Sequence, residues 1–94
     1  MIFYEDILHA KKNIRQFIYE TPLEKSYFLS DCSGAEVFLK LECQQVMKAF
    51  KIRGAFNKLL SLTEDEKKRG IMAASSGNHG ASVSYAASCL GINL

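Results

Sequence analysis

The segment Ser75–Gly80, which reads Ser-Ser-Gly-Asn-His-Gly, combines small and polar residues that suit the binding of an anion. Its glycines let backbone N–H groups come close to a ligand, and a helix that begins there adds unpaired donors and about half a positive charge. The spacing differs from the dinucleotide motif GxGxxG and from the Walker motif GxxxxGK(S/T), so we expect a carboxylate rather than a nucleotide phosphate. The alternative is a plain strand-to-helix turn capped by Ser or Asn, in which His79 is structural.

A second candidate is Lys51, in the sequence Phe-Lys-Ile-Arg-Gly-Ala that starts a predicted helix. A charged lysine in the first turn of a helix is opposed by the positive end of the helix dipole. Arg53 adds a cation nearby, and burial against Phe50 would further favour the uncharged amine that Schiff-base chemistry requires. The alternative is that Lys51 is an exposed lysine on a solvated helix. Its neighbours in a basic face would then be Lys40, Lys48 and Lys58.

Periodicity in the first half of the sequence predicts a helix over Glu5–Ile18 and then a β-hairpin. The apolar residues of this helix recur at steps of three and four and share one face. They are Ile7, Ala10, Ile14 and Phe17. Thr21-Pro22 ends the helix, because proline disfavours helical backbone in the residue before it. Alternating apolar residues in Lys25–Ser30 and Glu36–Leu41 predict the two strands, with Asp31–Gly34 as their turn.

The second half predicts a helix over Phe50–Leu62, a short helical turn and a third helix that stops at Gly91. Thr63 and Glu66 form a capping box for the short turn, which ends at Gly70. The apolar faces of the two longer helices are Ile52, Phe56, Leu59 and Leu60 in one, and Val83, Ala86, Ala87 and Leu90 in the other. The apolar run Ile71–Ala74 is typical of a strand covered on both faces, and Ile92 starts a further strand.

This order of elements predicts an α/β fold: a helix and a β-hairpin followed by a β-α-β-α portion of a parallel sheet. Because a parallel sheet needs its next strand, we expect residues 1–94 to form a single N-terminal fragment of a longer protein. An unpaired edge at Ile71–Ala74 would recruit a second copy, so we also expect a homo-oligomer.

Composition bounds the remaining possibilities. The 94 residues are 48% hydrophobic and 23% charged, which allows one small domain at most. A net charge of +2 is too small to imply a nucleic-acid partner, and we find no signal peptide or membrane segment, so we expect a cytoplasmic protein. Three cysteines without CxxC spacing predict neither a disulfide framework nor a metal site. We expect Cys32, Cys43 and Cys89 to be reduced and mostly buried.

Taken together, the motif around Lys51 and the later Ser76-Gly77-Asn78-His79-Gly80 resemble the fold type II pyridoxal-phosphate enzymes, which are tryptophan synthase β-like. The resemblance is to the threonine dehydratase and serine racemase group in particular. It extends over most of the chain. The further similar segments are Thr21-Pro22-Leu23, Val37–Glu42, Gln45 and Arg53–Lys58.

The resemblance implies a role for each matching residue. Lys51 would be catalytic and would carry pyridoxal 5'-phosphate, Phe50 would lie beside the cofactor ring, and Asn78 would bind its phenolic oxygen. Ser76 takes the place of the second catalytic acid or base of the racemases. The substrate carboxylate would be held by Ser75, Ser76, Gly77, Asn78, His79 and Gly80. The family's phosphate-binding loop, rich in glycine, is absent from these 94 residues.

The implied activity is elimination of water and ammonia from threonine or serine to give a 2-oxo acid, a reaction of amino-acid metabolism such as isoleucine biosynthesis. The fragment alone would be inactive. Residues 1–45 would belong to the large domain and 46–94 to the start of the small domain. Serine racemization, a noncatalytic interaction module and a single-stranded nucleic-acid binder are the alternatives. One departure from the family is Lys48, where many relatives have glycine.

Overall fold

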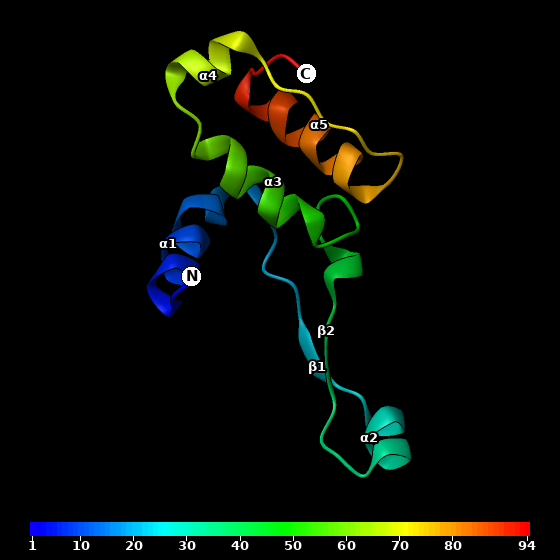
Figure 1. The fold of residues 1–94 in the computed structure, drawn as a ribbon. Helices are drawn as coiled ribbons and strands as arrows, with labels where there is room; N and C mark the ends of the chain where they lie inside the picture. The colour runs from blue at the N-terminus through cyan, green and yellow to red at the C-terminus, as the bar shows by residue number, and fades with distance from the viewer.

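The computed structural model describes all 94 residues. Its helices are α1 (Tyr4–Ile14), α2 (Tyr27–Ser33), α3 (Lys51–Leu60), α4 (Glu64–Arg69) and α5 (Asn78–Leu90), with 3-10 turns η1 (Arg15–Phe17) and η2 (Glu42–Gln44). Its strands are β1 (Leu23–Lys25) and β2 (Phe38–Lys40). A helical body of α1, α3, α4 and α5 carries a projecting arm formed by the two strands, with α2 at its tip (Figure 1).

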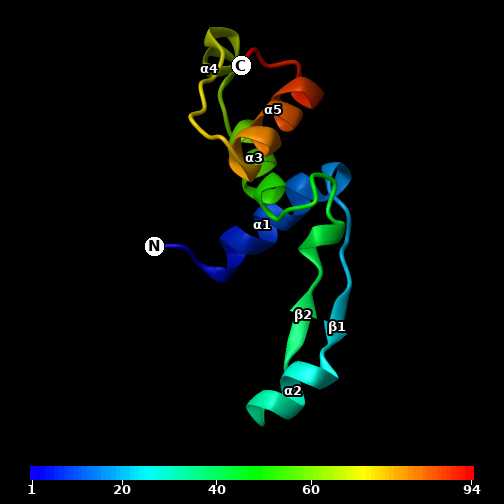
Figure 2. The same cartoon turned by 90° about the vertical axis from the view of Figure 1, so that its right-hand side faces the viewer.

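The arm makes the molecule elongated. Its principal extents are 52 × 31 × 24 Å and its radius of gyration is 16.1 Å, against about 12 Å for a compact chain of this length. A view turned by 90° shows the same separation of arm and body (Figure 2). The buried side chains therefore concentrate in the body, and both candidate segments belong to it.

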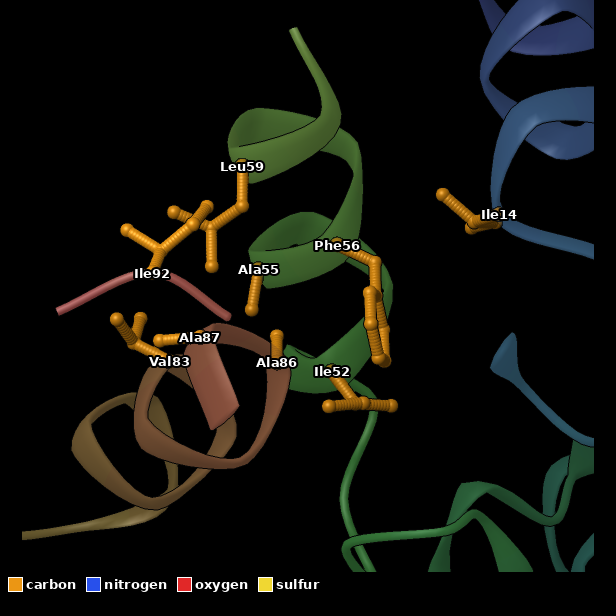
Figure 3. Packing of buried hydrophobic residues seen from close by; sticks show 9 residues of the cluster. All are labelled: Ile14, Ile52, Ala55, Phe56, Leu59, Val83, Ala86, Ala87 and Ile92. Atoms are coloured by element: carbon orange, nitrogen blue, oxygen red, sulfur yellow. The ribbon is translucent and has the colours of Figure 1, made fainter. Parts of the chain in front are cut away.

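The core lies mainly between α3 and α5. Alanines 55, 86 and 87 let the two helices approach closely, and Ile92 folds back over them after α5 ends (Figure 3). On the other flank of α3, the ring of Phe56 stacks on Phe17 with centroids 4.6 Å apart. The cluster comprises Ile14, Ile52, Ala55, Phe56, Leu59, Val83, Ala86, Ala87 and Ile92.

The predicted helices are confirmed with small changes in their ends. In α3 the predicted apolar residues are buried, apart from the half-buried Leu60. The capping box of Thr63 and Glu66 starts α4, and Gly91 ends α5 with a φ of 66°. In α1 only Ile14 of the predicted face is buried, because α1 meets α3 only near its C-terminal end.

The hairpin is present, but one of its predicted strands is wrong. β1 and β2 are antiparallel, and Leu23 pairs with Lys40. Most of the predicted strand Lys25–Ser30 is instead the beginning of α2. Ser26 caps this helix by accepting a hydrogen bond from the Leu29 N–H at 3.3 Å, and Gly34 ends it with a φ of 71°. These local end signals outweigh the alternation of apolar residues, since no side chain of α2 is buried.

The parallel strands predicted at Ile71–Ala74 and after Ile92 are also wrong. The segment 71–74 is extended, but its contact with the other segment is one hydrogen bond, from the Ile71 N–H to the Asn93 carbonyl at 2.8 Å. Met72 is 95% exposed, so the run is not covered on both faces. The only sheet is the two-stranded one. The oligomer expected from an unpaired strand edge stays a prediction.

Two further observations concern the cysteines and membrane association. Cys32, Cys43 and Cys89 are all exposed free thiols, so the expectation that they are mostly buried is wrong. They lie on α2, η2 and the solvent side of α5 rather than in the core. None of the helices combines the length and the apolar composition needed to cross a bilayer.

Candidate functional site

The structure brings the two candidate segments to one end of the helical body. Lys51 is the first residue of α3 and Asn78 is the first residue of α5. The two helices run side by side in the same direction, so their N-termini lie at the same end in both views (Figures 1 and 2). This parallel arrangement exists because α4 and the extended segment after it return the chain to the end where α3 began.

Lys51 is exposed at this end. Its Nζ atom lies 5.2 Å from the centroid of the Phe50 ring, within the range of a cation–π contact. Phe50 is itself 59% exposed, so the expected burial of Lys51 against it is wrong. The Lys51 side chain makes no hydrogen bond to another residue, and its amine is open to solvent.

The loop before α5 leaves backbone donors open. Gly77 is the N-cap and no side chain caps the helix, so the alternative of a turn capped by Ser or Asn is not what forms. The Ser75 hydroxyl instead accepts from the Gly77 N–H at 3.2 Å, and the first helical bond runs from Ala81 N–H to the Gly77 carbonyl at 3.1 Å. The N–H groups of residues 78, 79 and 80 have no acceptor in the protein. Three donors at the positive end of a 13-residue helix suit a carboxylate.

The two glycines of the loop differ in what their positions require. A Cβ on Gly80 would come within 2.7 Å of the Ser75 carbonyl oxygen, so the tight fold of the loop requires glycine there. Gly77 has a φ of −132°, which any residue adopts, and a Cβ on it would meet nothing within 4 Å. Neither conformation nor packing explains this glycine.

The predicted polar residues of the loop face solvent and make few contacts. Ser76, Asn78 and His79 are exposed, and no side-chain hydrogen bond ties them to the body. No hydrogen bond links the loop to Lys51. The structure therefore places both candidate groups at one end of the helical body, with the loop's donors free.

Sequence reasoning missed a polar cluster beside α3 as part of the site. The guanidinium of Arg53 forms a two-pronged ion pair with Glu42, from Nε to Oε2 at 2.8 Å and from Nη2 to Oε1 at 2.7 Å. The Thr21 hydroxyl donates to the same carboxylate, and Lys40 Nζ donates to the Thr21 carbonyl at 2.5 Å. Chiefly through the Arg53 hydrogen bonds, the pKa of Glu42 falls to about 2. The positive charge of Arg53 is therefore balanced by the ionised Glu42, so the expectation that it acts on Lys51 as an additional cation is wrong.

Gln45 fixes the connector that leads into α3. Its side chain is fully buried and pairs with both backbone groups of Tyr19: Oε1 accepts from the N–H at 2.8 Å and Nε2 donates to the carbonyl at 2.9 Å. Oε1 also accepts from the Val46 N–H at 3.0 Å. These partners are far apart in sequence, so only the similarity of Thr21, Glu42, Gln45 and Arg53 to the family could have signalled them.

Lys48 occupies a strained position three residues before Lys51. Its φ of 56° lies in the left-handed region and is the only such value outside glycine in the chain. The Lys48 N–H donates to the Gln45 carbonyl at 2.8 Å, which closes the turn. Left-handed backbone disfavours any residue with a Cβ, which explains physically why glycine suits this position.

Two hollows lie on other parts of the surface. One, of about 380 Å³, is lined mainly by apolar residues including Phe17, Val46 and Tyr85. The other, of about 810 Å³, lies between α1 and α3 and includes Arg53 and Gly54. Neither is lined by Lys51 or by the loop. No group of three His, Cys, Asp or Glu side chains is arranged to hold a metal ion.

Comparison with known proteins links this geometry to one family. Residues 14–94 match the family model described as "Pyridoxal-phosphate dependent enzyme". An L-threonine ammonia-lyase of Thermotoga maritima is 46% identical over 92 residues, covering 98% of this chain and 23% of that protein. The catabolic L-threonine dehydratase of Escherichia coli K12 is 46% identical over 89 residues, covering 95% of this chain and 27% of that protein.

The solved structure of maize serine racemase superposes with a TM-score of 0.86 at 37% identity, over 95% of this chain and 28% of that one. The chain thus spans about a quarter of the length of the relatives it matches. It has their N-terminal α/β arrangement of helices and a two-stranded hairpin. With an exposed lysine and a helix start with open N–H donors inside the matched region, this chain belongs to the pyridoxal-phosphate dependent enzymes.

Proposed function

We propose that this sequence supplies part of the active site of a threonine or serine ammonia-lyase, which removes water and ammonia and releases a 2-oxo acid. The observation that carries the proposal is the common end of α3 and α5. There, the unbonded Lys51 amine and three open N–H donors of α5 lie on neighbouring helices. The identities of 46% to proteins named threonine ammonia-lyase and threonine dehydratase support this substrate class.

Residues at this end fit pyridoxal phosphate. The Lys51 amine is accessible for covalent attachment to the cofactor aldehyde, and it can afterwards accept the proton from the substrate Cα. Phe50 is exposed beside it and offers a ring face, and the Asn78 side chain is free to donate to an oxygen of the cofactor. When bound, pyridoxal phosphate supplies the electron sink that makes loss of this proton feasible.

The loop then orients the substrate. Open N–H groups at residues 78 to 80 bind the carboxylate, helped by the hydroxyls of Ser75 and Ser76 and by His79. A carboxylate held at the end of α5 restricts rotation of the amino acid, which aims one bond of the Cα at the base. Gly77 leaves room for this approach because it has no side chain.

Serine racemization is the second candidate, and Ser76 favours it. Its hydroxyl is exposed and makes no hydrogen bond in the protein, so it is free to serve as an acid or base on the opposite side of the substrate. A Ser76→Ala variant separates the two reactions. Loss of D-serine formation with 2-oxo acid production retained indicates racemization through Ser76, whereas equal retention of both removes Ser76 from the chemistry.

The proposal extends to the assembly. We propose that residues 1–45 belong to a larger domain of the enzyme and that residues 46–94 begin a smaller one. We also propose that the enzyme is cytoplasmic and that it forms a homo-oligomer. The apolar residues exposed at the start of α1 and on α2, such as Phe3, Tyr4 and Phe28, support burial against further protein.

The decisive experiment is Lys51→Ala in protein that carries this sequence and has been loaded with pyridoxal phosphate. Borohydride reduction followed by peptide mapping should find the cofactor on Lys51 in the parent and no longer on this peptide in the variant, which should lose turnover of threonine. Lys58→Ala is the matched control, because Lys58 is an exposed lysine of the same helix. Normal activity of the Lys51→Ala variant would overturn the proposal.

A further inference from the structure

The ion pair between Arg53 and Glu42 holds α3 at a place that its apolar core does not reach. In a helix successive residues are about 100° apart, so Lys51 and Arg53 lie on opposite sides of the buried face, each about 100° from its centre. Ile52, Ala55 and Phe56 pack on that face and resist separation of α3 from the body. Packing along one face leaves a small rotation of the helix about its axis less restricted, and this rotation would move Lys51.

The two-pronged pair restricts this rotation. Both guanidinium contacts, at 2.8 and 2.7 Å, must be kept at once, and a fork of this kind fixes the plane and the direction of the arginine. Its partner is itself held: the Glu42 carboxylate accepts from the Thr21 hydroxyl and is only 16% exposed. Glu42 opens η2 next to the hairpin, so the fork joins the first turn of α3 to the base of the arm.

We propose that Glu42 and Arg53 are positioning residues that set the direction of the Lys51 amine by fixing the rotation of the first turn of α3. Neither residue touches the reacting atoms. The inference rests on the proposed function, because it assumes that the orientation of Lys51 matters to a reaction. The low pKa of Glu42, about 2, means that the pair stays charged throughout the pH range in which an enzyme of this kind is assayed.

The test measures kcat and KM for threonine in four variants of the protein that carries this sequence, loaded with pyridoxal phosphate, with kcat expressed per bound cofactor. A purely structural defect lowers the loaded fraction and leaves kcat per bound cofactor unchanged. We expect Glu42→Gln to lower kcat about tenfold while KM changes less than about twofold, because a misdirected base slows proton transfer more than it weakens carboxylate binding. Arg53→Lys keeps the charge but cannot form the fork, and it should show the same loss.

Glu36→Gln is the matched control. It removes a carboxylate that is paired with Lys25 at 2.7 Å on the arm and is 76% exposed, and it should leave kcat unchanged. The double variant Glu42→Gln/Arg53→Lys should be no slower than either single variant, since both act through one contact. Values of kcat equal to the parent in both single variants would overturn the inference, even while Lys51→Ala still abolishes turnover and upholds the proposed function. If Glu42→Gln fails to fold, Arg53→Lys alone gives the answer.

Discussion

Acid should destabilise this chain partly through Glu42, and the size of the effect follows from the structure. The pKa of Glu42 is lowered from 4.5 to about 2, with the hydrogen bonds from Arg53 as the largest cause. A carboxyl with a depressed pKa in the folded state stabilises that state above its unfolded pKa. This contribution is fully present above about pH 5 and is lost as the pH falls through 4.5 towards 2.

A pKa difference of this size corresponds to about 3 kcal/mol in the free energy of unfolding. Solvent reduces it, because the side chains of Glu42 and Arg53 are 16% and 33% exposed, so we expect about 1 to 2 kcal/mol. The assay is urea unfolding followed by circular dichroism at pH 7, 4.5, 3 and 2, in the parent and in Glu42→Gln. The difference between them should shrink as the pH falls across this window.

Other carboxyl groups also become protonated in acid. Comparing the parent with Glu42→Gln cancels their contribution to the free energy of unfolding, because both proteins contain them. The pKa of Glu66 is lowered by the backbone and hydroxyl of Thr63, but this effect is common to the parent and to the variant. Glu36→Gln is again the control, since its exposed pair with Lys25 should add little. A difference between parent and Glu42→Gln that stays constant from pH 7 to pH 2 would refute the assignment of the stabilisation to the ionised Glu42.

Four further predictions concern substitutions at single positions. The Ser82 hydroxyl is buried without a hydrogen-bond partner, so Ser82→Ala should raise the free energy of unfolding by about 1 kcal/mol in urea titrations, and a loss of stability would contradict this assignment. Lys48→Gly should raise the free energy of unfolding by up to about 1 kcal/mol, because glycine adopts the left-handed backbone at this position without strain. Lys48→Ala, which keeps a Cβ, should show no such gain. Gly80→Ala should lower the melting temperature because its Cβ would lie 2.7 Å from a carbonyl oxygen. Gly77→Ala should leave the melting temperature unchanged and raise KM for threonine, and unchanged KM would argue against carboxylate binding at the loop.

Much of the helical body could be read from the sequence, because its signals are local. The periodicity of Ile52, Phe56 and Leu59 identifies the buried face of α3, and the capping box of Thr63 and Glu66 marks the start of α4. The candidate residues could also be found, since a lysine at one helix start and a glycine-rich loop at another are visible as patterns. Their chemistry as a pair could be suggested only through the family resemblance.

The rest depended on which tertiary contacts form and which do not. The alternating residues before Ser30 form α2 because Ser26 and Gly34 bound a helix there and no core draws the side chains inward. Ile71–Ala74 stays an isolated extended segment because a strand exists only where a neighbour supplies backbone partners. The pairing of Glu42 with Arg53, 11 residues apart, depends on how the arm joins α3. Local patterns therefore determine the helices and the candidate groups of this protein, and long-range packing determines where Lys51 and the loop donors come to lie.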